Sequence, residues 1–410
     1  MIFVGVDVSK ADHCLGAIDA QGQVVQKPVR FTQDAAGYAR LASLLRSLGD
    51  PSQVTVGCEA TGHYWVLLAE EIRRLGYAPQ VFNPILSSDA GRLSVRGRKT
   101  DEDDCLVIAK VLRDGGFSAV RLPDEHAGCL KRLCRHRQAT VARTANLKKR
   151  LITLLDQVFP EFATLFSEPH GPTARAVLAK APSARLLATH TAKPFTSLVR
   201  KASHGRLGLE RVKDVLAAAK TSIAVQRHDT STELAIRHTI QEIALLEEQT
   251  AVYDAEIAAI PVAGRELLTT IPGIGVVLAA VILAEIGSID AFRRTANDPR
   301  PSDALHRLLA FAGLDPRIRI SGQWAGKTRM SKRGSRALRT ALYRAAFIAR
   351  TDPSFKDCYD QHRKIMKQPG KVALSHVARK VLQAVYGVLR YQKPFDPIAF
   401  KHGPKHQRTA

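Results

Sequence analysis

Residues 1–10 read MIFVGVDVSK and describe a strand that carries one acidic residue. Every residue from Ile2 to Val8 is apolar or glycine except Asp7. A carboxylate in the middle of an apolar strand is costly to bury unless it binds a positively charged partner. We therefore treat Asp7 as the first candidate functional residue of the chain.

The residues that follow predict a mixed sheet with helices between its later strands. The turn Asp19–Gly22 separates two further strands, and Gly115-Gly116 is a typical end for the last helix. The predicted strands are 2–8, 13–19, 23–31, 53–60 and 78–83, and the predicted helices are 35–48, 65–75 and 101–113. This order predicts an α/β domain over residues 1–120 with a ribonuclease-H/RuvC-like mixed sheet.

The rest of the chain predicts helices almost throughout. Residues 121–264 read as a coiled-coil-like middle region, with long helices over 126–158 and 230–259 and shorter ones over 160–223. Long helices that cannot bury their faces alone are expected to pair within the chain or between protomers. Residues 265–350 read as a compact α-helical domain, and 351–410 as a basic helical tail with a disordered end.

The charge is uneven, and it predicts the partner. The chain has 61 Lys and Arg against 38 Asp and Glu, a formal net charge of +23. Residues 293–410 hold 26 Lys and Arg, 7 Asp and no Glu, while residues 126–155 hold eight basic residues and no acid. Charge of one sign on this scale repels itself unless a polyanion neutralises it, so we expect nucleic acid as the partner.

Other partners and compartments are disfavoured. The basic blocks lack an aromatic-rich apolar face for a membrane surface, and the longest apolar run, Val276–Ile286, is too short to span one and contains Glu285. No signal peptide is visible, and six cysteines without a CxxC pair argue against a disulfide framework or a zinc site. We therefore expect no membrane partner and a reducing cytoplasm.

Three more acids can join Asp7. Glu59 ends the strand VTVGCE, and Asp101 and Asp104 share one face of a first helical turn in RKTDEDDCLVIAK. Carboxylates gathered at one sheet edge repel each other, and a divalent cation such as Mg²⁺ relieves that repulsion. The alternative is that Asp101 and Asp104 only cap their helix and interact with its dipole.

The C-terminal half holds two candidate phosphate-binding motifs. TTIPGIGVVLAAVILAEIG (269–287) reads as helix, tight turn and helix, a helix-hairpin-helix-like unit in which Gly273 and Gly275 would expose backbone N–H groups. The alternative is a plain helix–helix turn. Downstream, Ser321-Gly322 opens a basic loop in which a serine can act as nucleophile or only donate a hydrogen bond to phosphate, and Ser331 and Ser335 are equally plausible by composition. The candidate nucleic-acid ligands are Lys99, Arg317, Arg319, Lys327, Arg329, Lys332, Arg333 and Arg336, with the two glycines.

Together these motifs resemble the DEDD-type insertion-sequence transposases of the IS110 family, which includes the Piv/MooV site-specific invertases. The motifs that carry the resemblance are VGVDVSK, CEATGHYW, KTDEDD, TTIPGIGVVLAAVILAEIG, AFAGLDP and SGQ…MSKRGSRALRTALYRAA. They cover residues 1–120 and about 265–350. One departure is Cys105, where the family commonly has alanine after its last acid.

The resemblance implies a function and assigns roles to residues. It implies a RuvC-like domain in which Asp7, Glu59, Asp101 and Asp104 bind Mg²⁺, with Mn²⁺ as a substitute, and a catalytic serine at Ser321. It implies an RNA-guided serine recombinase that cuts and rejoins donor and target DNA through a phosphoserine, as a homo-oligomer (dimer or tetramer) in the bacterial cytoplasm at the nucleoid. The guide would be a structured RNA transcribed from the element itself.

Three other functions compete with this one. A RuvC-like Mg²⁺-dependent endonuclease or resolvase would use the same four acids and form no covalent serine adduct. GVDVSK also resembles the first phosphate loop of sugar kinases and actin-like ATPases, but that fold needs a second copy of the domain, and none is visible in the sequence. A non-catalytic nucleic-acid-binding module would leave the four carboxylates unexplained.

Overall fold

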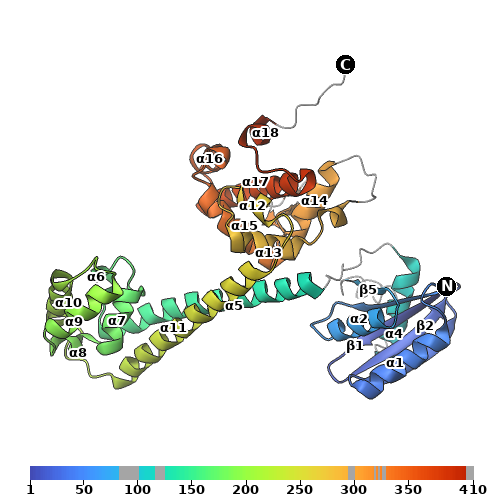
Figure 1. Cartoon of the computed structure of the whole chain (residues 1–410), viewed down its shortest axis with the longest axis horizontal. Helices are drawn as coiled ribbons and strands as arrows, with labels where there is room; N and C mark the ends of the chain where they lie inside the picture. Colours follow the sequence, from blue (N-terminus) through green and yellow to red (C-terminus); the bar gives the residue numbers. More distant parts are fainter. Residues whose placement is uncertain are drawn as a thin grey trace. The chain divides into compact units, whose positions relative to one another are not determined.

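The computed structural model describes residues 1–82, 101–115, 125–293, 301–317, 320–321, 324–325 and 329–402. The chain divides into two compact units, Met1–Pro123 and Asp124–Ala410, which we describe separately (Figure 1). The boundary also divides the charge. Residues 1–123 hold 14 Lys and Arg and 14 Asp and Glu, so the whole net charge of +23 lies on residues 124–410.

The N-terminal unit is built on a five-stranded mixed sheet in the order β3-β2-β1-β4-β5. β1 pairs antiparallel with β2, and β2 with β3, while β1, β4 and β5 run parallel. The strands are β1 (Ile2–Val8), β2 (Asp12–Asp19), β3 (Val24–Thr32), β4 (Val54–Glu59) and β5 (Pro79–Phe82). These strands confirm the predicted mixed α/β domain, whereas its ribonuclease-H/RuvC-like character stays a prediction.

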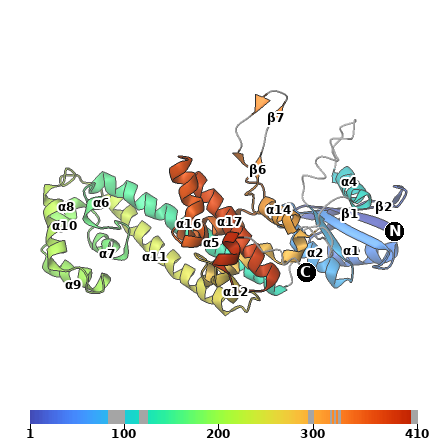
Figure 2. The same cartoon turned by 90° about the horizontal axis from the view of Figure 1, so that it is seen from above.

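Helices cover both faces of this sheet (Figure 2). α1 (Ala35–Leu48) and α2 (Trp65–Arg74) pack on one face, where Val4, Val6 and Val8 of β1 join Leu41 and Leu68 in one apolar cluster. α4 (Asp101–Asp114) packs on the other face, where Ile108 and Leu112 contact Phe3 and Phe82. The alternation of side chains along β1 therefore decides which of its residues face α4.

Gly5 permits the close approach of α4 to β1. A Cβ atom at this position would lie 2.1 Å from the carbonyl oxygen of Cys105 and 2.5 Å from the backbone nitrogen of Ala109. Because only glycine leaves room for that backbone, the first half of α4 lies directly on β1.

The second unit contains a long antiparallel helix pair, α5 (Glu125–Val158) and α11 (Thr230–Ala259), close to the predicted helices 126–158 and 230–259 (Figure 1). Arg137 pairs with Asp254, and Lys148 Nζ lies 2.8 Å from Glu247 Oε1. At the far end of the pair, five short helices enclose a core that includes Phe159, Phe162 and Phe195. They are α6 (Phe162–Leu165), α7 (Pro172–Lys180), α8 (Ala184–Ala188), α9 (Lys193–Ala202) and α10 (Leu209–Thr221).

At the other end of the pair, the remaining helices share one core. They are α12 (Arg265–Thr269), α13 (Val276–Ile286), η1 (Ile289–Phe292), α14 (Pro301–Phe311), α15 (Arg336–Ala349), α16 (Pro353–Asp360), η2 (Gln361–Ile365), α17 (Gly370–Tyr391) and α18 (Pro397–His402). We expected residues 351–410 to form a tail, but Val377, Val381 and Val385 of α17 are fully buried in the core that α17 shares with α15. The described part of this segment, up to residue 402, is therefore mostly helical and belongs to the core, while the predicted disordered end lies mostly outside the described residues.

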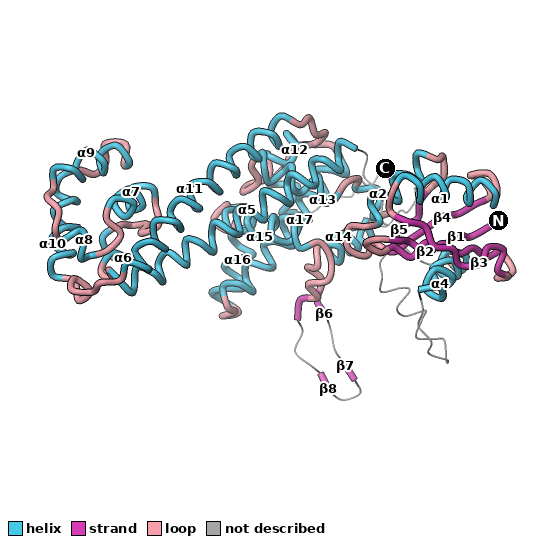
Figure 3. Tube along the Cα trace, turned by 90° about the horizontal axis from the view of Figure 1, so that it is seen from below, coloured by secondary structure: helices cyan, strands magenta, loops and turns pink. Residues whose placement is uncertain are grey.

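Four two-residue strands interrupt the helices between α14 and α15. β6 (Pro316–Arg317) pairs with β9 (Arg329–Met330), and β7 (Ile320–Ser321) pairs with β8 (Trp324–Ala325) (Figure 3). They lie within the basic loop identified from the sequence. None of the described helices combines the length and hydropathy that crossing a bilayer requires.

Candidate active site

Asp7, the penultimate residue of β1, and Glu59, the last residue of β4, lie on the same face of the sheet in adjacent parallel strands. Val6 of β1 is in register with Cys58 of β4, so Asp7 and Glu59 are the next residues of their strands. Asp7 follows Phe3 and Gly5 on the face toward α4, and Glu59 follows Gly57, where an added Cβ would lie 2.6 Å from Leu112 of α4. Both carboxylates are therefore at the carboxyl ends of parallel strands, where sites on α/β sheets gather.

α4 runs antiparallel to β1 and brings its first turn to the same edge. Phe3 contacts the cluster that contains Leu112, whereas Gly5 meets Cys105 and Ala109. Moving along β1 toward Asp7 thus means moving toward the N-terminus of α4. Burial raises the pKa of the Cys105 thiol, the neighbouring Cys14 raises it further, and the charge of Asp7 adds to the effect. The structure therefore places Asp7 near the start of α4.

Asp104 precedes Cys105 in that first turn and is half-buried, as are Asp7 and Glu59. The backbone of Asp101 is the first residue of α4, but its side chain lies outside the described residues, as does Lys99. The described side chains contain no cluster of three or more His, Cys, Asp or Glu that could hold a metal ion. The structure thus places Asp7, Glu59 and the first turn of α4 at the same edge and face of the sheet, but the described side chains do not form a group of three that could hold a metal ion.

The chemistry of this edge fits a hard divalent cation. The candidate donors are all carboxylate oxygens, which Mg²⁺ prefers, and no described basic side chain forms an ion pair with Glu59. Thr61 Oγ1 donates a weak hydrogen bond to Glu59 Oε2 at 3.4 Å. On the opposite face, burial and the charge of Glu59 raise the pKa of Cys58 to about 12, so this thiol stays protonated.

The glycine turn before α13 lies between two helices, and its two glycines differ. Gly273 has a φ of 86°, and a Cβ there would lie 2.4 Å from the carbonyl oxygen of Ala345, so it is needed for packing against α15. Gly275 is the N-cap of α13, is exposed and has open space around it. Phosphate binding at Gly275 stays a prediction. At Gly273 the close packing against α15 already explains why the residue is glycine.

The basic loop is described only in part. Ser321 is the second residue of β7, and its side chain lies outside the described residues, as do those of Arg317, Arg319, Lys327 and Arg329. Lys332, Arg333 and Arg336 are exposed and flank the N-terminus of α15. Cations at an exposed helix N-terminus add to its positive potential, so this cluster suits phosphate.

The two other candidate serines have structural partners. Ser331 Oγ donates to Asp315 Oδ1 at 2.5 Å. Ser335 Oγ donates to Glu285 Oε2 at 2.8 Å and accepts the N–H of Leu338 as the N-cap of α15. Both hydroxyls therefore stabilise the fold, and composition could not have separated them from Ser321.

Glu285, for which no role was predicted, joins the C-terminal core to α5. Arg135 Nε and Nη2 lie 2.7 and 3.1 Å from its two carboxylate oxygens, and Lys131 lies 4.0 Å away. Burial disfavours the charged carboxylate, but these cations and Ser335 together lower the pKa of Glu285. An acid within an apolar helix was the only signal available, and its partner is 150 residues away.

Comparisons with known proteins find similar sequences along most of the chain. A DEDD transposase family model matches residues 4–160, and a model of the IS116/IS110/IS902 family of transposases matches residues 265–360. The candidate transposase of the IS117 mini-circle from Streptomyces coelicolor is 25% identical over 407 residues, which cover 96% of this chain and 95% of that protein. An uncharacterized 42 kDa protein of the insertion element IS900 from Mycobacterium paratuberculosis is 28% identical over 97% of both chains. The pilin gene-inverting protein of Moraxella bovis is 34% identical over 136 residues, 32% of this chain and 38% of that protein.

Proposed function

Because the chain belongs to the IS110 family of DEDD-type transposases, enzymes that act on DNA, we propose that it is a recombinase that cuts and rejoins DNA through a phosphoserine at Ser321. The similarity to pilin gene-inverting proteins supports recombination as the outcome. The observation that supports the proposal is that Asp7 and Glu59 lie near the carboxyl ends of adjacent parallel strands, on the face of the sheet on which α4 packs.

In the proposed site, Asp7, Glu59, Asp101 and Asp104 hold Mg²⁺, or Mn²⁺ in its place. A bound divalent cation would supply charge stabilisation to phosphate oxygens during strand cleavage. The protein's own contribution is to hold the carboxylates on one rigid face, since β1, β4 and α4 fix their backbones. Half-burial of Asp7, Glu59 and Asp104 keeps water from fully screening their charge.

The proposed serine step conserves the phosphodiester bond energy. Ser321 Oγ forms a bond to the phosphorus while the bond from phosphorus to one DNA oxygen breaks, and the hydroxyl proton passes to that leaving oxygen. Attack by the hydroxyl of another strand reverses the step and frees the serine. The cations of the basic loop, including Lys332, Arg333 and Arg336, would offset the negative charge that develops on the phosphorane.

The wider proposal includes the partners that the family resemblance implies. A structured RNA encoded by the element would select donor and target DNA, and the enzyme would act as a homo-oligomer at the bacterial nucleoid. The basic residues 124–410 support nucleic-acid binding in general, because they hold all the net charge. The alternative is a RuvC-like endonuclease that uses the same acids and forms no covalent adduct.

A denaturing gel with labelled DNA and a substrate that traps the intermediate tests this function. The wild-type protein should carry label through the gel, whereas Ser321→Ala and Asp7→Asn should lose both the adduct and recombination and still bind DNA. Asp12→Asn is the matched control for Asp7, because Asp12 forms an exposed ion pair with Arg30 at 3.0 Å. Ser331→Ala and Ser335→Ala should retain the adduct at reduced yield.

Two outcomes would contradict the proposal. Label on Ser321→Ala would place the nucleophile elsewhere in the loop. Cleavage by the wild-type protein without any adduct would favour the endonuclease.

A further inference from the structure

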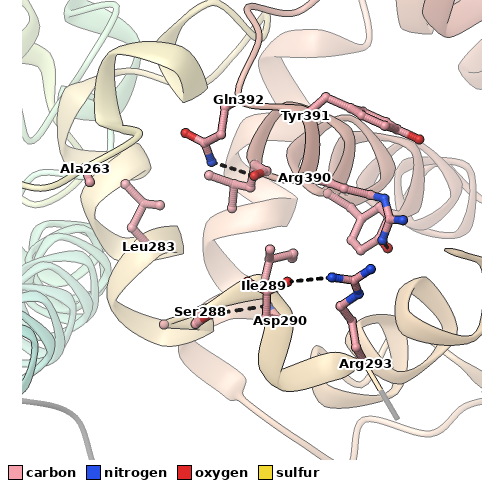
Figure 4. A pocket seen from close by; sticks show the side chains of 12 residues that line it. Ala263, Leu283, Ser288, Ile289, Asp290, Arg293, Arg390, Tyr391 and Gln392 are labelled. Atoms are coloured by element: carbon pink, nitrogen blue, oxygen red, sulfur yellow. Dashed lines mark hydrogen bonds and ion pairs between the residues drawn. The ribbon is translucent and has the colours of Figure 1, made fainter. Parts of the chain in front are cut away.

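A cavity of about 550 Å³ lies in the second unit, between the end of α13, the short helix η1 and the end of α17 (Figure 4). Its volume falls in the ~300–1,000 Å³ range of small-molecule sites. It is separate from the four acids, which belong to the other unit, and nothing in the proposed mechanism uses it.

One side of the cavity is apolar. Leu283 of α13 and Leu389 of α17 are almost fully buried, and Ala263 lies beside them. Figure 4 shows Ala263 and Leu283 on the side of the cavity away from the two arginines. This side suits a flat apolar group that must leave water.

The opposite side is cationic. The guanidinium groups of Arg293 and Arg390 face each other there (Figure 4). Arg293 Nη1 lies 3.3 Å from Asp290 Oδ1, while its buried Nε has no hydrogen-bond partner among the described residues. Arg390 Nη1 donates to the hydroxyl of Tyr386 at 3.1 Å, a neutral partner. This side of the cavity thus holds two guanidinium groups and one carboxylate, that of Asp290. A bound anion would balance the excess positive charge.

An aromatic ring stands at the rim. Tyr391 is 57% exposed, and Arg390 lies over its ring at 5.8 Å from the centroid. Gln392 adopts a left-handed conformation and donates its amide Nε2 to the carbonyl oxygen of Leu389 at 2.6 Å, which fixes the chain just beyond the ring. An exposed ring held in this way is a stacking platform for a base.

We infer that this cavity binds one unpaired nucleotide of a nucleic-acid strand. The base stacks on Tyr391 at the rim beside Arg390, its phosphate lies between Arg293 and Arg390, and the apolar side of the cavity accommodates the rest of the nucleotide. The inference rests on the proposed function only in taking nucleic acid as the partner.

Photo-cross-linking of the full chain tests the placement. Single-stranded oligonucleotides that carry 5-iodouridine at one position are irradiated with the protein, and the linked peptide is identified by mass spectrometry. We expect cross-links at Tyr391 or Tyr386, and none with a fully paired duplex of the same sequence. Cross-links confined to other parts of the chain would overturn the inference.

Binding measurements on variants test the chemistry. Tyr391→Ala should weaken binding of the oligonucleotide by about tenfold, the loss expected for one stacked base, while Tyr391→Phe should bind normally. Arg390→Gln should reduce the salt slope by about 0.7, the value for one phosphate of a single strand. Ala263→Phe, which fills the apolar side without changing charge, should also weaken binding about tenfold.

Matched controls make these results specific. Phe347 of α15 is equally exposed, at 58%, and Lys371 is an exposed cation at the other end of α17. Phe347→Ala and Lys371→Gln should leave the oligonucleotide affinity within twofold of wild type. Lys371→Gln should in addition change the salt dependence of binding only slightly. Equal losses in these controls and in the cavity variants would contradict the inference. Competition by an acidic peptide, with no competition by a mononucleotide, would instead assign the cavity to a protein partner and overturn it.

The two proposals can fail independently. If no phosphoserine adduct forms but Tyr391 cross-links to the oligonucleotide, the recombinase mechanism is wrong and the nucleotide cavity stands. If the adduct forms and the cavity variants bind normally, the cavity assignment alone is wrong.

Discussion

At the scale of single residues, Glu285 shows how one buried charge couples distant segments. Its side chain is 1% exposed, within an otherwise apolar helix, and Arg135 of α5 provides two hydrogen bonds while remaining 56% exposed itself. Lys131 lies 4.0 Å away and contributes its charge without a hydrogen bond, and burial lowers its own pKa despite the attraction of Glu285. Ser335 completes the set and also caps α15, so three helices depend on this carboxylate.

Replacing Glu285 with Gln should therefore destabilise the protein in a pH-dependent way. In the folded protein the pKa of Glu285 is lowered from its ordinary value of 4.5. The charged carboxylate therefore stabilises the fold above pH 4.5, and this stabilisation is lost as the pH falls through the folded-state pKa. At pH 7 the variant should lose about 1–3 kcal/mol, typical of hydrogen bonds to a charged group, and the loss should shrink below pH 4.5. Urea denaturation at several pH values measures it. Glu210→Gln, which breaks an ion pair in which Glu210 is 83% exposed, is the control, and an equal loss at all pH values for Glu285→Gln would refute the assignment.

At the scale of elements, the periodicity of the sequence predicted the helices and strands better than it predicted how they pack. All five strands and the helices of the first unit appear near the expected residues, because alternation and glycine punctuation are local signals. α17 was taken for part of a basic tail because Lys and Arg far outnumber Asp and Glu in residues 351–410, but Val377, Val381 and Val385 form a buried stripe. The two-residue strands β6 to β9 carry no periodic signal, so nothing in the sequence could predict them.

The contact of α4 with β1 gives a prediction that leaves every carboxylate in place. Gly5→Ala puts a Cβ into the backbone of Cys105 and Ala109, so α4 must move away from β1. Overpacking of this kind costs about 1–3 kcal/mol or more, and it should displace Asp104 from Asp7 and Glu59. We expect a lower melting temperature and a loss of DNA cleavage larger than the loss of DNA binding. Gly208→Ala, at a position with open space and negative φ, should change neither, and normal cleavage by Gly5→Ala would show that the acids do not act together.

At the scale of the whole molecule, sequence reasoning predicted the strand positions of Asp7 and Glu59 but not how the chain holds them. Asp7 and Glu59 were foreseeable because strand ends and parallel pairing follow from pattern. The nucleotide cavity was not, because Leu283 and Arg390 are more than 100 residues apart and meet only through the packing of α13 on α17. The division of charge between units likewise appears only once the structure places a boundary at residue 123.

That division predicts where nucleic acid binds and how binding responds to salt. Residues 1–123 are electrically neutral in sum, so residues 124–410 should provide nearly all the phosphate contacts. Six to ten contacts would lower affinity for duplex DNA by about 10³- to 10⁵-fold between ~50 and ~200 mM salt. Fluorescence anisotropy at several salt concentrations should give the full chain and residues 124–410 the same slope, and residues 1–123 weak binding with a shallow slope. The chain should be divided at the boundary between the two units, because a fragment that ends near Ile260 would leave Arg135 without its partner Glu285. Within residues 124–410, replacing Lys332, Arg333 and Arg336 together by Gln should reduce the salt slope by up to about 2.7, because each lost phosphate contact accounts for ~0.9. The same replacement at three control positions should reduce the slope less; these are Arg206, Lys213 and Lys220. If residues 1–123 alone bound DNA with full affinity and an unchanged slope, the nucleic-acid surface would lie on that unit, and the prediction would be wrong.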